Sequence, residues 1–307
     1  MHEFVHVALA HDHPRRIAWP DGELTGRGHG AVTRVCAQQL DPVVGDLDGN
    51  RRLALSAIAQ GVDAGAEVIV LPELVTSGYM FESADEAAAA AIAPDHEILR
   101  EWADAARRHG VIIAGGFAEL GQDGNTYNSA AVIDPTGLRA VYRKLHLWDR
   151  EKLWFEPGAE PPPVLETRIG RLSVIVCYDV EFPELTRIIA LAGTQLLLVP
   201  TNWPLMDRPE GERPGEVVIA MGAARGNRMA VACADRTGVE RGQPWTGCST
   251  IIGADGWVAA EKAGADALGT GPVIADIDLE LALDKRYTEL ADVFADRRPA
   301  LYRGLAQ

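Results

Sequence analysis

The distribution of apolar positions changes near residue 31, and from there it predicts a regular series of strands and helices. Residues 31–40 alternate between apolar and polar side chains, which predicts a strand with one buried face. Residues 47–64 place apolar side chains at helical spacing, and the run AEVIVLPE at 66–73 is typical of a strand buried on both faces. A strand, a helix and a buried strand in succession indicate an α/β protein.

The same pattern continues along the rest of the chain. It predicts further helices at 98–109, 183–192 and 214–227; strands at 111–117, 171–176, 195–200, 229–235 and 272–279; and hairpins at 127–144, around Pro135-Thr136-Gly137, and at 249–262, around Asp255-Gly256. Crossover helices and hairpins together imply mixed sheets, so we predict a layered α/β sandwich. No Pro/Ser-rich linker divides residues 31–307, which we interpret as one domain.

Residues 1–30 differ in composition from this domain. They hold five of the eight histidines and end in the glycine-spaced GELTGRGHG. His2 and His6 form a literal H-E-x-x-H, which binds zinc only on a helix with a third ligand downstream. Here it stands at the terminus with no room for a preceding turn. We therefore interpret residues 1–30 as a leader, a cloning remnant or a loosely docked extension, and predict no metal site.

Charge and composition exclude several classes of partner. The chain has 29 Lys+Arg against 44 Asp+Glu, a formal net charge of −15, so nucleic acid and anionic membrane surfaces are poor partners. A hydrophobic share of 47% excludes wholesale disorder. No apolar stretch reaches the ~18–20 residues of a bilayer span, and the start lacks the pattern of a signal peptide. We predict a cytoplasmic protein.

Four residues with reactive side chains follow or end predicted strands, where α/β folds collect their functional groups. Glu73 follows VIVLP, Glu119 follows VIIAGGFA, Lys144 ends AVYRK and Cys177 ends RLSVIV. One such charge is usually a solvated residue at a strand end. Together, a nucleophile, two carboxylates and an ammonium group can carry out acyl transfer on a C–N bond without a metal or an organic cofactor.

Cys177 is the sharpest of these candidates. The chain must turn abruptly between the strand ending at residue 176 and the helix starting near Pro183, so the thiol can face a pocket. A helix N-terminus there would lower the thiol pKa and offer N–H groups to an oxyanion. His146 is the candidate partner for a rival Cys-His dyad, although a structural or pocket-lining role suits it better. The remaining cysteines, Cys36, Cys233 and Cys248, lie in predicted strands and are expected in the core.

These segments resemble a known family. LPELVTSGY with Glu73, YRKLHLW with Lys144 and VIVCYDVEFPE with Cys177 are similar to the three signature segments of the nitrilase superfamily of carbon–nitrogen hydrolases. GFAEL followed by NTYNSA resembles the segment of the family's second glutamate, here Glu119, and DRTGVERGQPWTGCSTIIGADG resembles its downstream region. The resemblance extends from Ala31 to Tyr302.

The resemblance implies a four-layer αββα sandwich and a Cys-Glu-Lys site with a second glutamate. In this chain Cys177 would be the nucleophile, Glu73 the proton carrier, and Lys144 with the backbone N–H of Tyr178 the oxyanion donors. Glu119 would position Lys144 and the substrate nitrogen. The resemblance further implies that the chain pairs into a homodimer through helices, with a tail such as DRRPALYRG (296–304) crossing the partner.

The substrate is predicted from residues near the nucleophile. Cys177-Tyr178-Asp179 resembles the amidase branch of the family, aliphatic amidases in particular, whereas nitrilases proper resemble Cys-Trp-Glu. The acidic Glu181 argues against an anionic substrate, or else caps the following helix. We predict hydrolysis of short neutral aliphatic amides, with ω-amino amides or nitriles as alternative substrates and a catalytically silent binding module as the non-enzyme alternative. Apolar walls are predicted from Tyr79, Trp148, Phe155 and Trp203, unless these side chains simply belong to the core.

Overall fold

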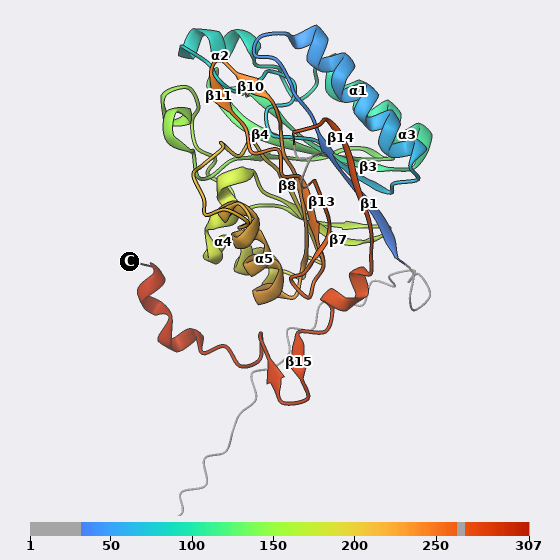
Figure 1. Ribbon diagram of the computed structural model, residues 1–307, viewed down its shortest axis with the longest axis vertical. Coiled ribbons are helices and arrows are strands. Elements are labelled where there is room, and N and C mark those ends of the chain that lie inside the picture. The colour runs from blue at the N-terminus through green and yellow to red at the C-terminus, as the bar shows by residue number, and fades with distance from the viewer. Residues whose placement is uncertain (1–31, 263–267, 307) are drawn as a thin grey trace, which may run out of the picture.

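The computed structural model describes residues 32–262 and 268–306 and contains two six-stranded mixed sheets (Figure 1). The first sheet has the order β14-β1-β2-β3-β4-β5 and the second β13-β12-β9-β8-β7-β6. Strands β1, β2 and β3 run parallel, as do β7, β8 and β9, and the outer strands pair antiparallel to them. The predicted α/β sandwich with mixed sheets is therefore confirmed.

The strand bounds are as follows. The first sheet contains β1 (Thr33–Gln39), β2 (Val68–Val70), β3 (Ile112–Leu120), β4 (Thr126–Asp134), β5 (Gly137–Arg143) and β14 (Gly271–Ile277). The second contains β6 (Val164–Thr167), β7 (Gly170–Val174), β8 (Leu196–Pro200), β9 (Ala230–Ala234), β12 (Thr250–Ile252) and β13 (Val258–Glu261). Two short ribbons pair β10 (Val239–Glu240) with β11 (Gln243–Pro244) and β15 (Arg286–Thr288) with β16 (Ala291–Asp292).

Helices cover the outer face of each sheet. They are α1 (Leu47–Asp63), α2 (Ala84–Ala90), α3 (Glu97–His109), α4 (Pro183–Leu191) and α5 (Gly215–Asn227), with short 3₁₀ turns elsewhere, among them Asp149–Leu153 and Cys177–Glu181. Helices α1 and α3 pack on the first sheet and α5 packs on the second with α4 beside it, which gives four layers (Figure 1). None of the helices in the described ranges is long and apolar enough to cross a bilayer.

Strand alternation divides the core between two interfaces. Along β1, Val35 and Ala37 face the second sheet and join the large cluster between the sheets, which includes Leu198 of β8. Cys36, between them, points the other way and belongs to the cluster on the side of α1 and α3, which also includes Trp102 of α3. Because successive side chains along a strand point to opposite faces, β1 contributes side chains to both apolar layers, and it is therefore buried along nearly its whole length.

Residues 1–30, predicted as a leader with the H-E-x-x-H sequence, lie outside the described residues. In the described ranges no group of three or more His, Cys, Asp or Glu side chains is arranged to hold a metal ion. Of the three cysteines expected in the core, Cys36 and Cys233 are buried, but Cys248 is only partly buried and precedes β12. The prediction for Cys248 was wrong because it lies in the loop before the strand rather than inside it.

Candidate functional site

Three of the predicted residues meet at the ends of three strands. Glu73 follows β2, Lys144 follows β5 and Cys177 follows β7. The Lys144 Nζ atom lies 2.7 Å from Glu73 Oε1, and both side chains are fully buried. Charge interactions join the Cys177 thiol to Glu73 and to Lys144. The structure thus brings together three of the four residues that follow or end predicted strands.

The loop that carries Glu73 lies directly on β3. Gly116 of β3 permits this, because a Cβ atom there would stand 2.4 Å from Leu74 N and 2.5 Å from Glu73 Cα. Leu74 has a positive φ of 48°, so the chain turns sharply straight after the glutamate. Any side chain larger than hydrogen at Gly116 would push the Glu73 carboxylate away from Lys144.

The turn that carries Cys177 is a 3₁₀ helix over Cys177–Glu181, with Cys177 itself at φ 46°. Asp179 holds this turn in place. Its carboxylate accepts from the backbone N of Val176 (3.1 Å) and from the backbone N of His146 (3.0 Å). Because His146 lies two residues after Lys144, Asp179 joins the segment of the nucleophile to the segment of the ammonium group.

The side chain of His146 also contacts Asp179, which links the segments of Cys177 and Lys144. Its Nδ1 atom lies 2.7 Å from Asp179 Oδ1, and its ring stacks on Phe182 with centroids 3.5 Å apart. Asp179 accepts a further bond from the Tyr142 hydroxyl, 2.8 Å away. The imidazole is thus bonded to a carboxylate rather than to the thiol, and this arrangement favours the structural role over a Cys-His dyad.

The second carboxylate of the cluster differs from the one predicted. Glu119 lies within β3 and binds Arg143 Nη2 (2.6 Å) and Ser129 Oγ (2.6 Å) instead of Lys144. Consecutive strand residues point to opposite faces, so a carboxylate that meets Arg143 shares the face opposite to Lys144. The prediction that Glu119 positions Lys144 was therefore wrong.

Glu151 takes the place expected for Glu119. It lies in the 3₁₀ turn Asp149–Leu153, only 2% exposed, and its Oε1 atom is 2.8 Å from Lys144 Nζ. Its Oε2 atom accepts from the backbone N of Trp148 at 3.2 Å, and the Tyr79 hydroxyl donates to Oε1. The sequence DREKL around it is typical of a solvated turn. The apolar residues on both sides of that turn, LHLW before it and WF after it, were the one signal of burial.

Burial and charge give the thiol, the carboxylate and the ammonium group different protonation states. Burial raises the pKa of Glu73 to about 7, against the opposing effect of Lys144. Burial opposes the charge of Lys144, but Glu151 and Glu73 more than offset it and raise its pKa. Burial, then Glu73, raises the pKa of Cys177 well above its usual value, although Lys144 and the backbone N–H of Asn202 lower it. The expected lowering by a helix N-terminus is thus outweighed, and the resting site pairs a neutral thiol with a charged ammonium group.

The two oxygens of Glu73 have different surroundings. Oε1 accepts from Lys144 Nζ and from Asn128 Nδ2, each at 2.7 Å. Oε2 is buried and has no hydrogen-bond partner in the described structure. Glu73 is therefore anchored through one oxygen and has the other free to accept a proton, as a general base requires.

The raised pKa of Glu73 predicts opposite pH trends for activity and stability. A general base must be ionised to act, so with Glu73 in its predicted role kcat/KM for the predicted amide substrate should rise as the pH increases through about 7. The unfolded chain binds fewer protons than the folded one between pH 4.5 and 7, so the free energy of unfolding should fall over the same window. Asp235, whose pKa burial also raises to about 7, adds to this fall.

Kinetic pH profiles and urea unfolding at several pH values would test both trends. Glu73→Gln is the matched variant, since it should lose activity at every pH and flatten part of the stability profile. A wild-type kcat/KM that stays constant between pH 5 and 8 would contradict the assignment of Glu73 as the base.

The predicted pocket residues divide into separate groups. The Trp148 ring packs edge-on against Tyr178 (4.8 Å), and Phe155 packs against Phe81 (5.9 Å). The backbone N of Trp203 donates to Asp235 Oδ1 at 2.9 Å. Tyr79 was predicted to form part of an apolar wall, but its hydroxyl donates a hydrogen bond to the Glu151 carboxylate.

Glu181 lines a cavity of about 360 Å³ between α4 and α5, and none of the other predicted pocket residues lines it. Its pKa is raised by burial and by Glu216, and the charge of Lys144 opposes this. The alternative that Glu181 caps α4 finds no support, because Phe182 is the N-cap and no side-chain hydrogen bond caps the helix.

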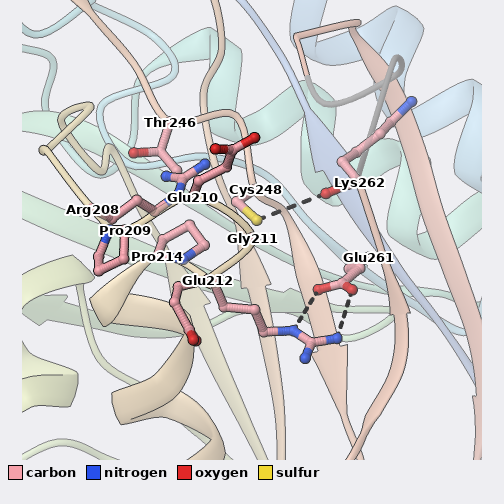
Figure 2. Close-up of a pocket in the computed structure, with 11 residues that line it drawn as sticks. Arg208, Pro209, Glu210, Gly211, Glu212, Pro214, Thr246, Cys248, Glu261 and Lys262 are labelled. Carbon is pink, nitrogen blue, oxygen red and sulfur yellow. Dashed lines mark hydrogen bonds and ion pairs between the residues drawn. The ribbon is translucent and has the colours of Figure 1, made fainter.

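A second cavity lies beside Cys248. It has a volume of about 560 Å³ and is bounded by the 208–214 loop and the end of β13 (Figure 2). Two of its lining residues, Arg213 and Glu261, form an ion pair with Nη2 and Oε1 2.8 Å apart. Glu73, Lys144 and Cys177 are not among its lining residues, so this cavity is separate from the thiol cluster.

A buried thiol beside a carboxylate and an ammonium group, on a sandwich of two mixed sheets, defines a class of cysteine-dependent hydrolases. Comparison with known proteins specifies the family. Residues 34–287 match the model of the carbon-nitrogen hydrolase family, and the chain belongs to that family, the nitrilase superfamily. The predicted resemblance is thus confirmed.

Relatives within the family carry different names. The chain is 35% identical over 274 residues to a nitrilase of Pyrococcus abyssi, covering 88% of this chain and 99% of that protein. It is 32% identical over 255 residues to an (R)-stereoselective amidase of a Pseudomonas species, covering 83% and 87%. Among solved structures, a variant of the amidase from Nesterenkonia sp. AN1 matches with a TM-score of 0.72 and 29% identity, covering 90% of this chain and 97% of that one. That structure has the acetamide moiety of fluoroacetamide added covalently at its active-site cysteine.

Proposed function

We propose that the protein is an amidase that hydrolyses short neutral aliphatic amides to a carboxylic acid and ammonia. The observation that carries this proposal is the arrangement of Lys144 between two buried carboxylates beside the Cys177 thiol, with Oε2 of Glu73 free. The similarity to an amidase modified at its cysteine by a fluoroacetamide-derived group supports the substrate class.

The geometry supports a thioester mechanism. Glu73 Oε2 takes the thiol proton as the sulfur attacks the amide carbon, and the resulting oxyanion accepts hydrogen bonds from Lys144 and the backbone N–H of Tyr178. Glu73 then passes the proton to the nitrogen, the C–N bond breaks and ammonia leaves a thioester. Glu73 next removes a proton from water as the water oxygen attacks the thioester; the C–S bond breaks, the acid leaves and the proton passes from Glu73 to the sulfur, which restores the thiol. Glu151 holds Lys144 in place throughout.

Ammonia release tests this function. Purified protein should release ammonia and propionate from propionamide, and a short nitrile should yield amide or acid in a ratio that separates amidase from nitrilase chemistry. Failure to turn over any amide or nitrile would overturn the proposal and favour a silent module.

One observation favours ω-amino amides as a second class of substrate. Glu181 is half-buried in the cavity between α4 and α5, and the charges of Glu216 and Lys144 both act on it. A substrate ammonium group that reached this cavity would meet the carboxylate of Glu181, with Glu216 in electrostatic range. The comparison of 5-aminopentanamide with pentanamide decides between the classes. If Glu181→Gln lowers kcat/KM for the amino amide and leaves that for pentanamide unchanged, the cationic substrate is favoured.

A homodimer is the proposed assembly. The faces of α4 and α5 expose the apolar side chains Ile188, Leu191, Val218 and Ile219. Burying such a patch against a second copy would remove it from water. Light scattering at micromolar concentration should give the mass of a dimer, and Ile188→Glu with Ile219→Glu should shift it to the monomer. A monomeric wild type would contradict the assembly.

A further inference from the structure

The hydroxyl of Tyr79 contacts the machinery around Lys144 directly. It donates to Oε1 of Glu151, the same oxygen that accepts from Lys144 Nζ at 2.8 Å. Oε1 of Glu151 therefore receives a neutral and a charged donor at once. Rotation of the Glu151 carboxylate away from Lys144 would break both bonds, so the tyrosine hydroxyl adds to the barrier against that rotation.

The backbone of Tyr79 is fixed by another buried carboxylate. Oε2 of Glu240 accepts from the backbone N of Tyr79 (2.9 Å) and from that of Met80 (2.7 Å). Gly78 makes this approach possible, since it has a φ of 74° and a Cβ there would lie 2.3 Å from Val44 Cα and 2.8 Å from Glu240 Oε1. Two successive N–H groups on one oxygen define the direction of the Tyr79 side chain.

Arg236 holds Glu240 from the other side. The arginine is fully buried, and its Nη1 and Nη2 atoms lie 2.9 and 3.1 Å from the two oxygens of Glu240. Its guanidinium carbon lies 4.7 Å from the centroid of the Trp245 ring, whose edge-to-face partner at 5.1 Å is Tyr79. A buried ion pair costs desolvation free energy, and bidentate geometry offsets that cost while it fixes orientation.

We propose that Glu240, paired with Arg236, is a positioning residue that acts through Tyr79 to hold Glu151 against Lys144. The inference rests on the proposed amidase function. Glu240 does not touch the thiol, Lys144 or Glu73; its effect reaches them through one tyrosine hydroxyl and one carboxylate.

A double-mutant cycle tests the proposal. Tyr79→Phe keeps the ring and removes the hydroxyl, and Glu240→Gln removes the charge that orders the Tyr79 backbone. Each should lower kcat for propionamide by about 10-fold or more and change KM by less than about 2-fold. Because both act through the same hydroxyl, the double variant should lose no more than about 2-fold beyond Tyr79→Phe.

Glu86→Gln is the matched control. Glu86 pairs with Arg241, which donates to the carbonyl of Met80, so this carboxylate supports the same loop without reaching the Tyr79 hydroxyl. Its kcat should stay within about 2-fold of the wild type. Losses that multiply in the double variant, or an equal loss in Glu86→Gln, would overturn the proposal in favour of a general structural role. If Glu240→Gln does not fold, Glu240→Asp keeps the charge but shortens its reach, and replaces it in the cycle.

Alkylation of Cys177 separates this proposal from the proposed function. Iodoacetamide reacts with a thiol in one step, so its rate constant at Cys177, followed by mass spectrometry of the peptide that contains this residue, reports on the Cys177, Glu73 and Lys144 arrangement without turnover. The rate should fall in Tyr79→Phe and Glu240→Gln and remain unchanged in Glu86→Gln. A wild type that releases no ammonia but shows this alkylation pattern would overturn the amidase and support the positioning role; equal alkylation rates in all variants would overturn the positioning role.

Discussion

Replacing Cys177 with alanine is expected to lower kcat for propionamide by about 10⁴-fold or more, because no acyl-enzyme can form without the sulfur. The side chain is small and buried at the start of a 3₁₀ turn, so the substitution should leave the fold unchanged. Ammonia release and the melting temperature, measured on the same preparation, check both parts of the prediction.

Cys248→Ala is the matched control for this experiment. Cys248 lies in the separate cavity of Figure 2, so its loss should leave kcat within about 2-fold of the wild type. Amide hydrolysis that survives in Cys177→Ala, or that disappears in Cys248→Ala, would show that the nucleophile has been assigned to the wrong residue.

Replacing Lys144 with methionine should affect stability as well as rate. The substitution keeps the length of the side chain but leaves Glu73 and Glu151 facing one another without the cation that separates them. Breaking a buried ion pair in this way costs about 3–5 kcal/mol of unfolding free energy. The loss of an oxyanion donor should lower kcat by about 10²–10³-fold.

Urea unfolding and propionamide hydrolysis measure these two effects. The neighbouring Lys152 is exposed, so Lys152→Met should change neither quantity appreciably. If Lys144→Met kept its unfolding free energy, the buried cluster could not be the stabilising ion-pair network that the distances indicate.

Strand-end positions made most of the site predictable. Glu73 and Cys177 follow the largely buried strands β2 and β7, and Lys144 follows the partly exposed strand β5. Functional groups in α/β folds collect beyond the carboxyl ends of strands, whatever the details of packing. The order of apolar runs along the chain was therefore enough to single out three residues that meet in the structure. Their roles as nucleophile, base and oxyanion donor stay predictions.

The other contacts of the site depend on the direction in which each side chain points, and sequence patterns specify this direction less well than they specify strand ends. Glu119 lies near the end of β3, as expected, but its side chain is on the same face as Arg143 and not on that of Lys144. A shift of one residue moves a strand side chain to the opposite face of the sheet. Glu151 lies in a turn whose charged neighbours are exposed, and only the tertiary contacts with Lys144 and Tyr79 turn it inward. Tyr79 has an apolar ring and a polar hydroxyl. The sequence around it could not show that the hydroxyl, and not only the ring, contacts the site.

The unequal oxygens of Glu73 also set an order of events in the proposed reaction. With Oε1 occupied by Lys144 and Asn128, Oε2 is the single position through which a proton can enter or leave this carboxylate. Departing ammonia and incoming water must therefore occupy the same place in turn. Deacylation then waits for ammonia to diffuse away, and added ammonia should compete with water for the thioester and slow the net release of acid.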